Sequence, residues 1–292
     1  MLHRIAAAGI VSLVTLLGTP AFAGVIYDNL TPNNSMATAT RPDTGSFEIE
    51  TGDDFFLGAP AKINSASFDG LLVPGTGGTP AVSQVVVEIY RVFPLDSNTA
   101  RTPNVPTRAN SPSDVAFDSR DSATAGQLTF TTSVLAGTFT ASNSVQPGGI
   151  HPKPGQTTLG NGPVTGQEVQ LDVTFTTPFD LPADHYFFVP QVFLTNGGEF
   201  FWLSASRPIS GAGTTPFPAG VTDLQTWTRD AFLDPDWLRV GTDIVGGSTP
   251  PTFNAAFSLD GTTVPEPSTL SLVGAGIGGF AFGFGRQKRG VK

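Results

Sequence analysis

The stretch Glu168-Val-Gln-Leu-Asp-Val-Thr-Phe175 indicates the fold class of this chain. Its apolar residues, from Val169 to Phe175, alternate with polar ones. A period of two turns one face of a strand toward a core and the other toward water. The stretch therefore predicts a half-buried strand of the kind that antiparallel sheets contain.

Similar strand signals recur along the chain between turn residues. The candidates lie at residues 25–28, 47–49, 54–57, 63–71, 82–93, 127–132, 134–140, 186–189, 199–204, 237–240 and 253–259. No stretch shows a sustained helical period, and 34 Gly and 25 Pro among 292 residues favour turns over long helices. We therefore predict an all-β fold, a single antiparallel β-sandwich of the jelly-roll or immunoglobulin-like kind over residues 24–263.

Loops interrupt the predicted strands in two places. Residues 94–125 and 142–166 are rich in Pro, Ser, Thr, Asn and Gly, and loops of this length are usually functional or poorly ordered. A shorter turn signal, Asn196-Gly-Gly198, predicts a hairpin between residues 186–194 and 199–204.

The charge balance excludes some partners. The chain has 15 Lys and Arg against 24 Asp and Glu, a formal net charge of −9. Five of these basic residues and one acidic residue lie in the terminal segments, so residues 24–263 carry 10 basic and 23 acidic residues, a net charge of −13. Such a surface repels phosphate backbones, so we expect no nucleic-acid partner. The absence of cysteine excludes thiol chemistry and zinc–thiolate sites.

Residues 1–23 follow the order of a signal peptide. Arg4 gives a basic start, residues 5–18 are an apolar run, and Pro20-Ala-Phe-Ala23 ends in an A-x-A cleavage pattern. An N-terminal membrane anchor would need a longer apolar stretch. We expect signal peptidase to cut between Ala23 and Gly24 and to leave the mature chain outside the cytoplasm.

Residues 264–292 contain a second ordered signal. It begins with the motif Pro265, Glu266 and Pro267. The apolar stretch at 270–285 is sixteen residues long, just short of the roughly 17–25 that cross a bilayer as a helix. A basic tail follows, with Arg286, Lys288 and Arg289. Positive charge after an apolar segment keeps a tail on the cytoplasmic side, so we expect a precursor held in the inner membrane by a C-terminal transmembrane helix.

This motif, helix and basic tail together resemble the PEP-CTERM sorting signal of exported bacterial proteins. The resemblance covers about a tenth of the chain. It implies cleavage near the motif by a membrane-embedded exosortase, and a Gram-negative host that usually secretes an exopolysaccharide. The alternative is a plain C-terminal membrane anchor with an incidental Pro-Glu-Pro.

Candidate chemistry in the body is sparse. No Gly-x-Ser-x-Gly elbow accompanies His151 or His185. Carboxylate pairs occur at residues 53–54 and at 234 and 236, and glycoside hydrolases need two carboxyl groups across a cleft. The candidates for sugar stacking are Trp202, Trp227 and Trp237, with Glu199 near the first.

Calcium is the one cofactor that the loop acids suggest. Asp114, Asp118 and Asp121 share a loop, and calcium prefers oxygen ligands of this kind. Their spacing matches no defined calcium loop, so solvated surface acids are the alternative.

We expect an exported, exosortase-processed protein of the cell surface or extracellular matrix. It has no evident catalytic activity, and we predict a structural or adhesive role in an exopolysaccharide layer. The alternatives are a carbohydrate-binding or glycan-active protein that uses exposed tryptophan and loop carboxylates, and a calcium-stabilised adhesin.

Overall fold

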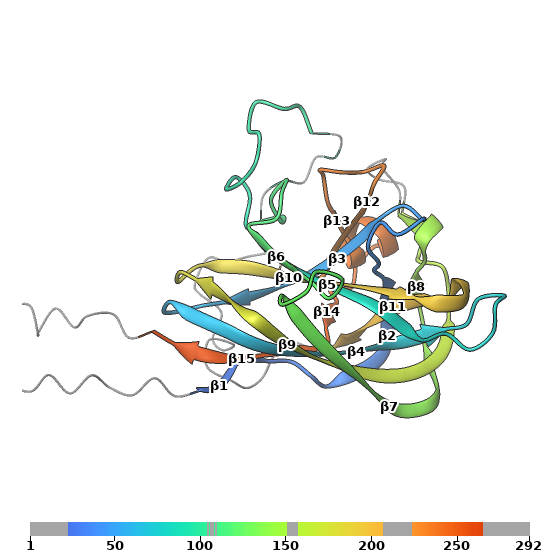
Figure 1. The fold of residues 1–292 in the computed structure, drawn as a ribbon. Helices are drawn as coiled ribbons and strands as arrows, with labels where there is room; N and C mark the ends of the chain where they lie inside the picture. The colour runs from blue at the N-terminus through green and yellow to red at the C-terminus, as the bar shows by residue number, and fades with distance from the viewer. Residues whose placement is uncertain are drawn as a thin grey trace, which may run out of the picture. The chain divides into compact units, whose positions relative to one another are not determined.

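Turns and longer loops join β-strands into two sheets (Figure 1). The computed structural model describes residues 23–103, 105, 108, 110–150, 157–206 and 224–264. Within these residues, the nine-stranded sheet contains β1 (Ala23–Asp28), β2 (Pro32–Ala39), β4 (Ala61–Val73), β7 (Leu128–Ala141), β8 (Ser144–Val145), β9 (Val164–Leu181), β11 (Glu199–Ala205), β14 (Asn254–Ala255) and β15 (Phe257–Thr263). The six-stranded sheet contains β3 (Ile49–Phe56), β5 (Val82–Arg91), β6 (Asp118–Asp121), β10 (His185–Leu194), β12 (Trp227–Asp230) and β13 (Leu238–Arg239). The prediction of a mainly β fold is confirmed.

The nine-stranded sheet is organised around the long strand β4. One edge of β4 pairs with β9, and its other edge pairs first with β15 and then with β11. The stretch quoted first lies inside β9, where Leu171 pairs with Phe68 and faces the core as predicted. Within the described residues, β2 and β8 pair in parallel, whereas the other named strand pairs are antiparallel. The expectation of a wholly antiparallel sheet is therefore wrong at this point.

Both sheets contribute to one apolar core. Phe68, Leu171 and Phe257 come from the nine-stranded sheet, and Val87 and Phe188 come from the six-stranded sheet. The rings of Phe188 and Phe257 stack with centroids 5.1 Å apart. Burial of large apolar side chains from both sheets is the main source of stability for such a fold, at about 25 cal/mol per Å² of apolar surface.

The predicted hairpin at residues 196–198 is wrong. The turn is present, as the 3₁₀-helix η2 (Thr195–Gly197), with left-handed backbone at Asn196 and Gly197. However, β10 pairs with β3 and β5, whereas β11 pairs with β2, β4 and β14. Both edges of β10 are occupied, so the turn carries the chain from one sheet to the other.

The two predicted loops contain short elements of their own. β6 lies in the first loop and pairs with β5. The second loop contains β8 and the 3₁₀-helix η1 (Pro147–Gly149). A π-helix, η3 (Val240–Val245), follows β13. The first loop, together with the turn between β12 and β13, supplies the side chains that pack on the outer face of the six-stranded sheet.

Candidate functional site

The three tryptophans predicted to stack on sugars are buried. Trp202, Trp227 and Trp237 are 1%, 0% and 1% exposed. Trp202 donates its indole N–H to the carbonyl of Ala256 at 2.9 Å, and Trp237 donates to the carbonyl of Ser113 at 3.0 Å. A sugar platform needs an exposed ring face, so their burial counts against the predicted stacking role.

The structure does not bring the three predicted calcium ligands together. Asp114 pairs with Arg108, and Asp118 accepts two hydrogen bonds from Arg120, at 2.5 and 3.0 Å. Asp121 lies at the other end of β6 and accepts from Gln84 Nε2 at 2.9 Å and from the backbone N–H of Ala123 at 2.8 Å. Each carboxylate therefore has its own donors. In the part of the chain that the structure describes, no group of three or more His, Asp and Glu residues could hold a metal ion.

The carboxyl groups of Asp53 and Asp54 stay together, because burial and then the charge of Asp54 raise the pKa of Asp53 well above its usual value. Asp53 is fully buried and accepts from the backbone N–H of Ala255, whereas Asp54 lies 3.3 Å from Nε2 of His185. Burial lowers the pKa of His185 to about 4, and its ring stacks on Phe56 with centroids 4.0 Å apart. A neutral, stacked imidazole of this kind is a packing group. His151 lies outside the described residues.

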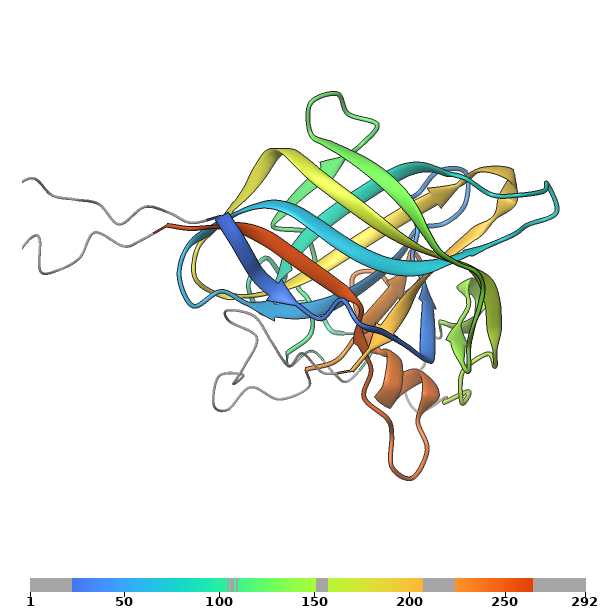
Figure 2. The same ribbon diagram turned by 90° about the horizontal axis from the view of Figure 1, so that it is seen from below.

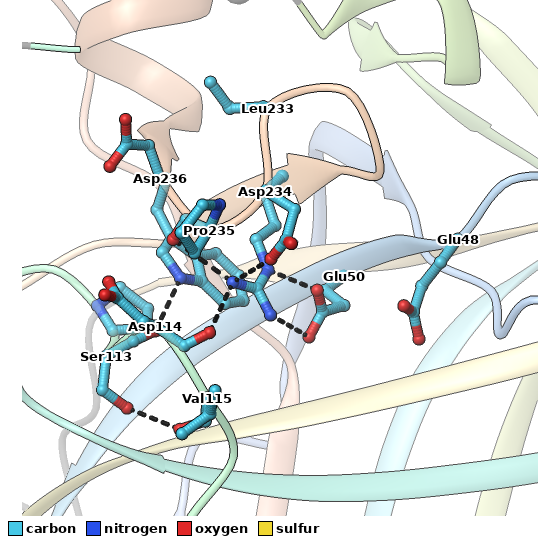
Figure 3. A network of polar contacts seen from close by, with 12 residues as sticks. Glu48, Glu50, Ser113, Asp114, Val115, Leu233, Asp234, Pro235 and Asp236 are labelled. Carbon is cyan, nitrogen blue, oxygen red and sulfur yellow. Dashed lines mark hydrogen bonds and ion pairs between the residues drawn. The ribbon is translucent and has the colours of Figure 1, made fainter. Parts of the chain in front are cut away.

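Arg229 is the centre of a buried polar network, and Figure 3 shows its partners Glu50, Asp114 and Asp234. Arg229 on β12 forms an ion pair with Glu50 on β3, and its Nη2 donates to the hydroxyl of Tyr90 at 2.9 Å. Its Nη1 lies 2.8 Å from Asp234 and donates to the backbone carbonyl of Asp114 at 3.0 Å. These bonds fasten two loops to the sheet.

The same network brings the carboxyl groups of Glu50 and Glu88 to one tyrosine hydroxyl. The hydroxyl of Tyr90 lies 2.5 Å from Glu50 Oε1 and 3.2 Å from Glu88 Oε2. Burial, and then the charge of Glu50, raise the pKa of Glu88 to about 8. Because that pKa lies above neutral, Glu88 is mostly protonated at pH 7. Glu50 and Tyr90 are buried, so this hydroxyl and the Glu50 carboxyl group face the protein interior and not a ligand.

Asp236 extends the network under the first loop. Its carboxylate is fully buried and contacts Arg101 at 2.5 Å and Arg108 at 3.3 Å. The guanidinium of Arg229 packs over the ring of Trp237, 4.4 Å from the ring centroid. Asp234 and Asp236 thus have different partners, although only Pro235 separates them. We interpret the network as the structural anchor of the loop.

A pocket of about 450 Å³ opens where β10 meets β11. It is lined by Arg41, Thr44 and Ser46 and by residues 192–199. Arg41 forms an ion pair with Glu199 and donates Nε–H to the carbonyl of Phe47 at 3.1 Å. A pocket of this volume is within the range of small-ligand sites.

Glu199 has one oxygen that no described residue bonds. Its Oε1 is buried and has no hydrogen-bond partner among the described residues, while Oε2 pairs with Arg41. Burial raises the pKa of Glu199, and Arg41 opposes that rise. A buried acceptor without a donor costs about 1–3 kcal/mol, so this oxygen destabilises the folded state locally.

Two aromatic rings continue outward from this ion pair. The guanidinium of Arg41 lies 4.7 Å from the centroid of the Phe47 ring, and the rings of Phe47 and Phe232 are 5.4 Å apart. Phe232 is 72% exposed, in the turn between β12 and β13. We refer to Arg41, Phe47, Glu199 and Phe232 as the rim cluster.

Of the rim cluster, the sequence predicts only Glu199 as a site residue. Phe232 could have been found from the sequence. It is a large apolar residue between Asp230 and Asp234, and these acidic residues indicate a turn at the surface. No sequence signal indicates Arg41, because its position depends on the pairing of β2 with β11.

A second pocket, of about 490 Å³, has no charged side chain in its lining. The lining consists of Leu72, Pro74, Gly78, Thr79, Pro80, Gly137, Thr138, Thr165, Gly166 and Gln167.

Comparison with known families concerns the end of the chain. Residues 263–289 match the PEP-CTERM protein-sorting motif. The PEP-CTERM motif marks an exported protein that an exosortase processes and whose precursor is anchored at its C-terminus. Curated proteins and solved structures give no match to the chain.

Most residues of the two terminal signals lie outside the described residues. These are the motif at 265–267, the apolar stretch at 270–285, the basic tail, and the signal peptide up to residue 22. Ala23 and Gly24 form the start of β1, paired with Thr262 and Gly261. Among the described residues, no helix has the length and apolar character to cross a membrane.

Proposed function

We propose that the mature body is a non-catalytic adhesive protein of the cell surface, and that it binds the extracellular polysaccharide around it through the rim cluster. Signal peptidase would remove the first 23 residues, and an exosortase would then cut near the PEP-CTERM motif. In this proposal the two sheets are the layers of the predicted sandwich, because both contribute to one core.

The rim cluster and its pocket carry this proposal. A neutral sugar presents hydroxyl groups on its rim and C–H groups on its faces. Arg41, Thr44 and Ser46 offer polar contacts in the pocket, and Glu199 holds Arg41 there through its ion pair. Phe232 offers an exposed ring to a sugar face. The exposed tryptophan of the original hypothesis is thus replaced by an exposed phenylalanine.

The charge of the body favours a neutral polymer over an anionic one. Residues 24–263 have a net charge of −13, and Arg41 is already paired with Glu199. An anionic sugar would have to compete with that carboxylate and approach an acidic surface.

The test is affinity electrophoresis of the exported protein in gels that contain dextran, xylan, alginate or the host exopolysaccharide. We expect a neutral polymer to retard the protein and the anionic alginate to have no effect. Phe232→Ser and Glu199→Gln should each weaken binding at least tenfold, which corresponds to about 1.4 kcal/mol. Leu159→Ser, at a site that is 68% exposed, is the matched control and should leave binding unchanged. Migration unaffected by all four polymers, or retardation that neither variant changes, would refute the proposal.

A further inference from the structure

The strand β7 (Leu128–Ala141) forms an open edge of the nine-stranded sheet. Within the described residues it pairs only with β9 (Figure 2). Its pairing is regular from Leu128 to Val134, opposite Phe175 to Val169, and shifts register only beyond Val134. Residues 128–134 therefore present a continuous row of outward backbone donors and acceptors, to which another strand can pair.

This edge lacks the features that protect exposed strands. Natural edges are short, charged or interrupted by proline. The 14 residues of β7 include no charged residue and no proline. By contrast, β6 has four residues, Asp-Ser-Arg-Asp, while β8 and β13 have two residues each. The regular part of β7 is rich in threonine with phenylalanine and valine, which favour strands.

The apolar core extends onto β7, and among the described residues no further strand lies beyond it in the sheet. Leu128, Phe130, Thr132 and Val134 lie opposite core residues of β9, and cross-strand partners share a face. Burial decreases along this row. Leu128 is 4% exposed, Phe130 is partly buried against the core, and Val134 is 58% exposed. An added strand would complete the layer.

We propose that residues 128–134 of β7 pair, antiparallel, with the same residues of a second copy of this chain. A two-fold axis at Thr131 places Leu128 opposite Val134 and Phe130 opposite Thr132. In each of these pairs, both residues point to the same face of the strand. The core faces of the two copies therefore lie on the same side of the joined sheet. Such an interface is isologous and closes as a dimer.

The absence of charged residues on this edge permits its pairing with a second copy. Self-pairing around a two-fold axis places each residue near its own kind, so a charged edge would repel itself, whereas this edge has no charge. The body has a net charge of −13, so repulsion between copies opposes association and salt relieves it. The pairing concerns assembly and does not depend on polysaccharide binding at the rim cluster.

The test is sedimentation velocity of the exported protein from 1 to 200 μM, at 50 and 500 mM NaCl. We expect a monomer–dimer equilibrium that salt strengthens. Thr131→Lys places two positive charges at the two-fold axis and should weaken the dimer at least tenfold. Thr176→Lys makes the same change at an exposed position of β9 and should leave the dimer intact.

Amide hydrogen exchange identifies the contact. Protection of residues 128–134 should rise with protein concentration in the parent protein and in Thr176→Lys, but not in Thr131→Lys. A monomer at 200 μM in both salts would overturn the proposal. A dimer that Thr131→Lys leaves unchanged, or assembly into open-ended species larger than a dimer, would also overturn it.

Discussion

Replacement of Arg229 by methionine tests the polar network most sharply. The side chains of Arg229 and Glu50 are each 5% exposed, so the variant leaves a carboxylate buried without its cation. Removal of one partner of a buried pair typically costs about 3–5 kcal/mol. The variant also loses the bonds to Tyr90, to the carbonyl of Asp114 and to Asp234. We therefore expect a loss of about 4 kcal/mol in the free energy of unfolding. For a body of about 240 residues, this lowers Tm by roughly 8–16 °C.

The assay is urea unfolding followed by tryptophan fluorescence, because all three tryptophans are buried. Lys62→Met is the matched control, since the pair of Lys62 and Asp180 is 50% and 68% exposed and should contribute about 0.2–1 kcal/mol. The double variant Glu50→Leu with Arg229→Met removes both charges and should recover part of the loss. An Arg229→Met variant within 1 kcal/mol of the parent, or no more affected than Lys62→Met, would refute the network's structural role.

Other predictions concern pH and packing. Because the folded state raises the pKa of Glu88 to about 8, its stabilising contribution is complete below the unfolded pKa near 4.5 and is lost as pH rises to 8. The unfolding free energy should fall by a few kcal/mol between pH 5 and 9, and Glu88→Gln should flatten this fall; parallel profiles would contradict the assignment. For His185 the sign is opposite, because the folded state lowers its pKa to about 4. The unfolding free energy should therefore decline as pH falls from 6.5 to 4. His185→Phe should remove that decline in the same titration. A Cβ at Gly70 would lie 2.2 Å from Phe200 Cζ and 2.6 Å from the carbonyl of Phe201, so Gly70→Ala should destabilise by more than 2 kcal/mol in urea, whereas Gly58→Ala, with open space around it, should change little. Equal midpoints for the two glycine variants would show that the packing at Gly70 is misjudged.

The local pattern of the sequence predicts many strands but not their partners. The alternation at residues 168–175 correctly indicates a strand with one buried face, because side-chain direction has a period of two in any strand. β2 was missed because Pro32-Asn-Asn-Ser-Met-Ala-Thr-Ala39 has no such alternation, and its strand conformation depends on its partner β11. The turn at residues 196–198 was recognised, but a turn signal does not determine whether two strands share a sheet.

The site shows the same limit. Aromatic type does not indicate exposure, and the three tryptophans fill cores while Phe232 is exposed. The pairing of Arg41 with Glu199 spans 158 positions, and that of Arg229 with Glu50 spans 179. Such contacts depend on strand register, which no short sequence motif determines. The terminal signals are different, because their meaning lies in the linear order of a motif, an apolar stretch and basic residues.

Export and sorting underlie every functional proposal for this chain. The most direct measurement is intact-mass spectrometry of the protein from matched hosts with and without an exosortase. We expect a new C-terminus near residues 265–267 only in the host that has the exosortase, on a chain that begins at Gly24. A C-terminus at Lys292 in both hosts would contradict this processing.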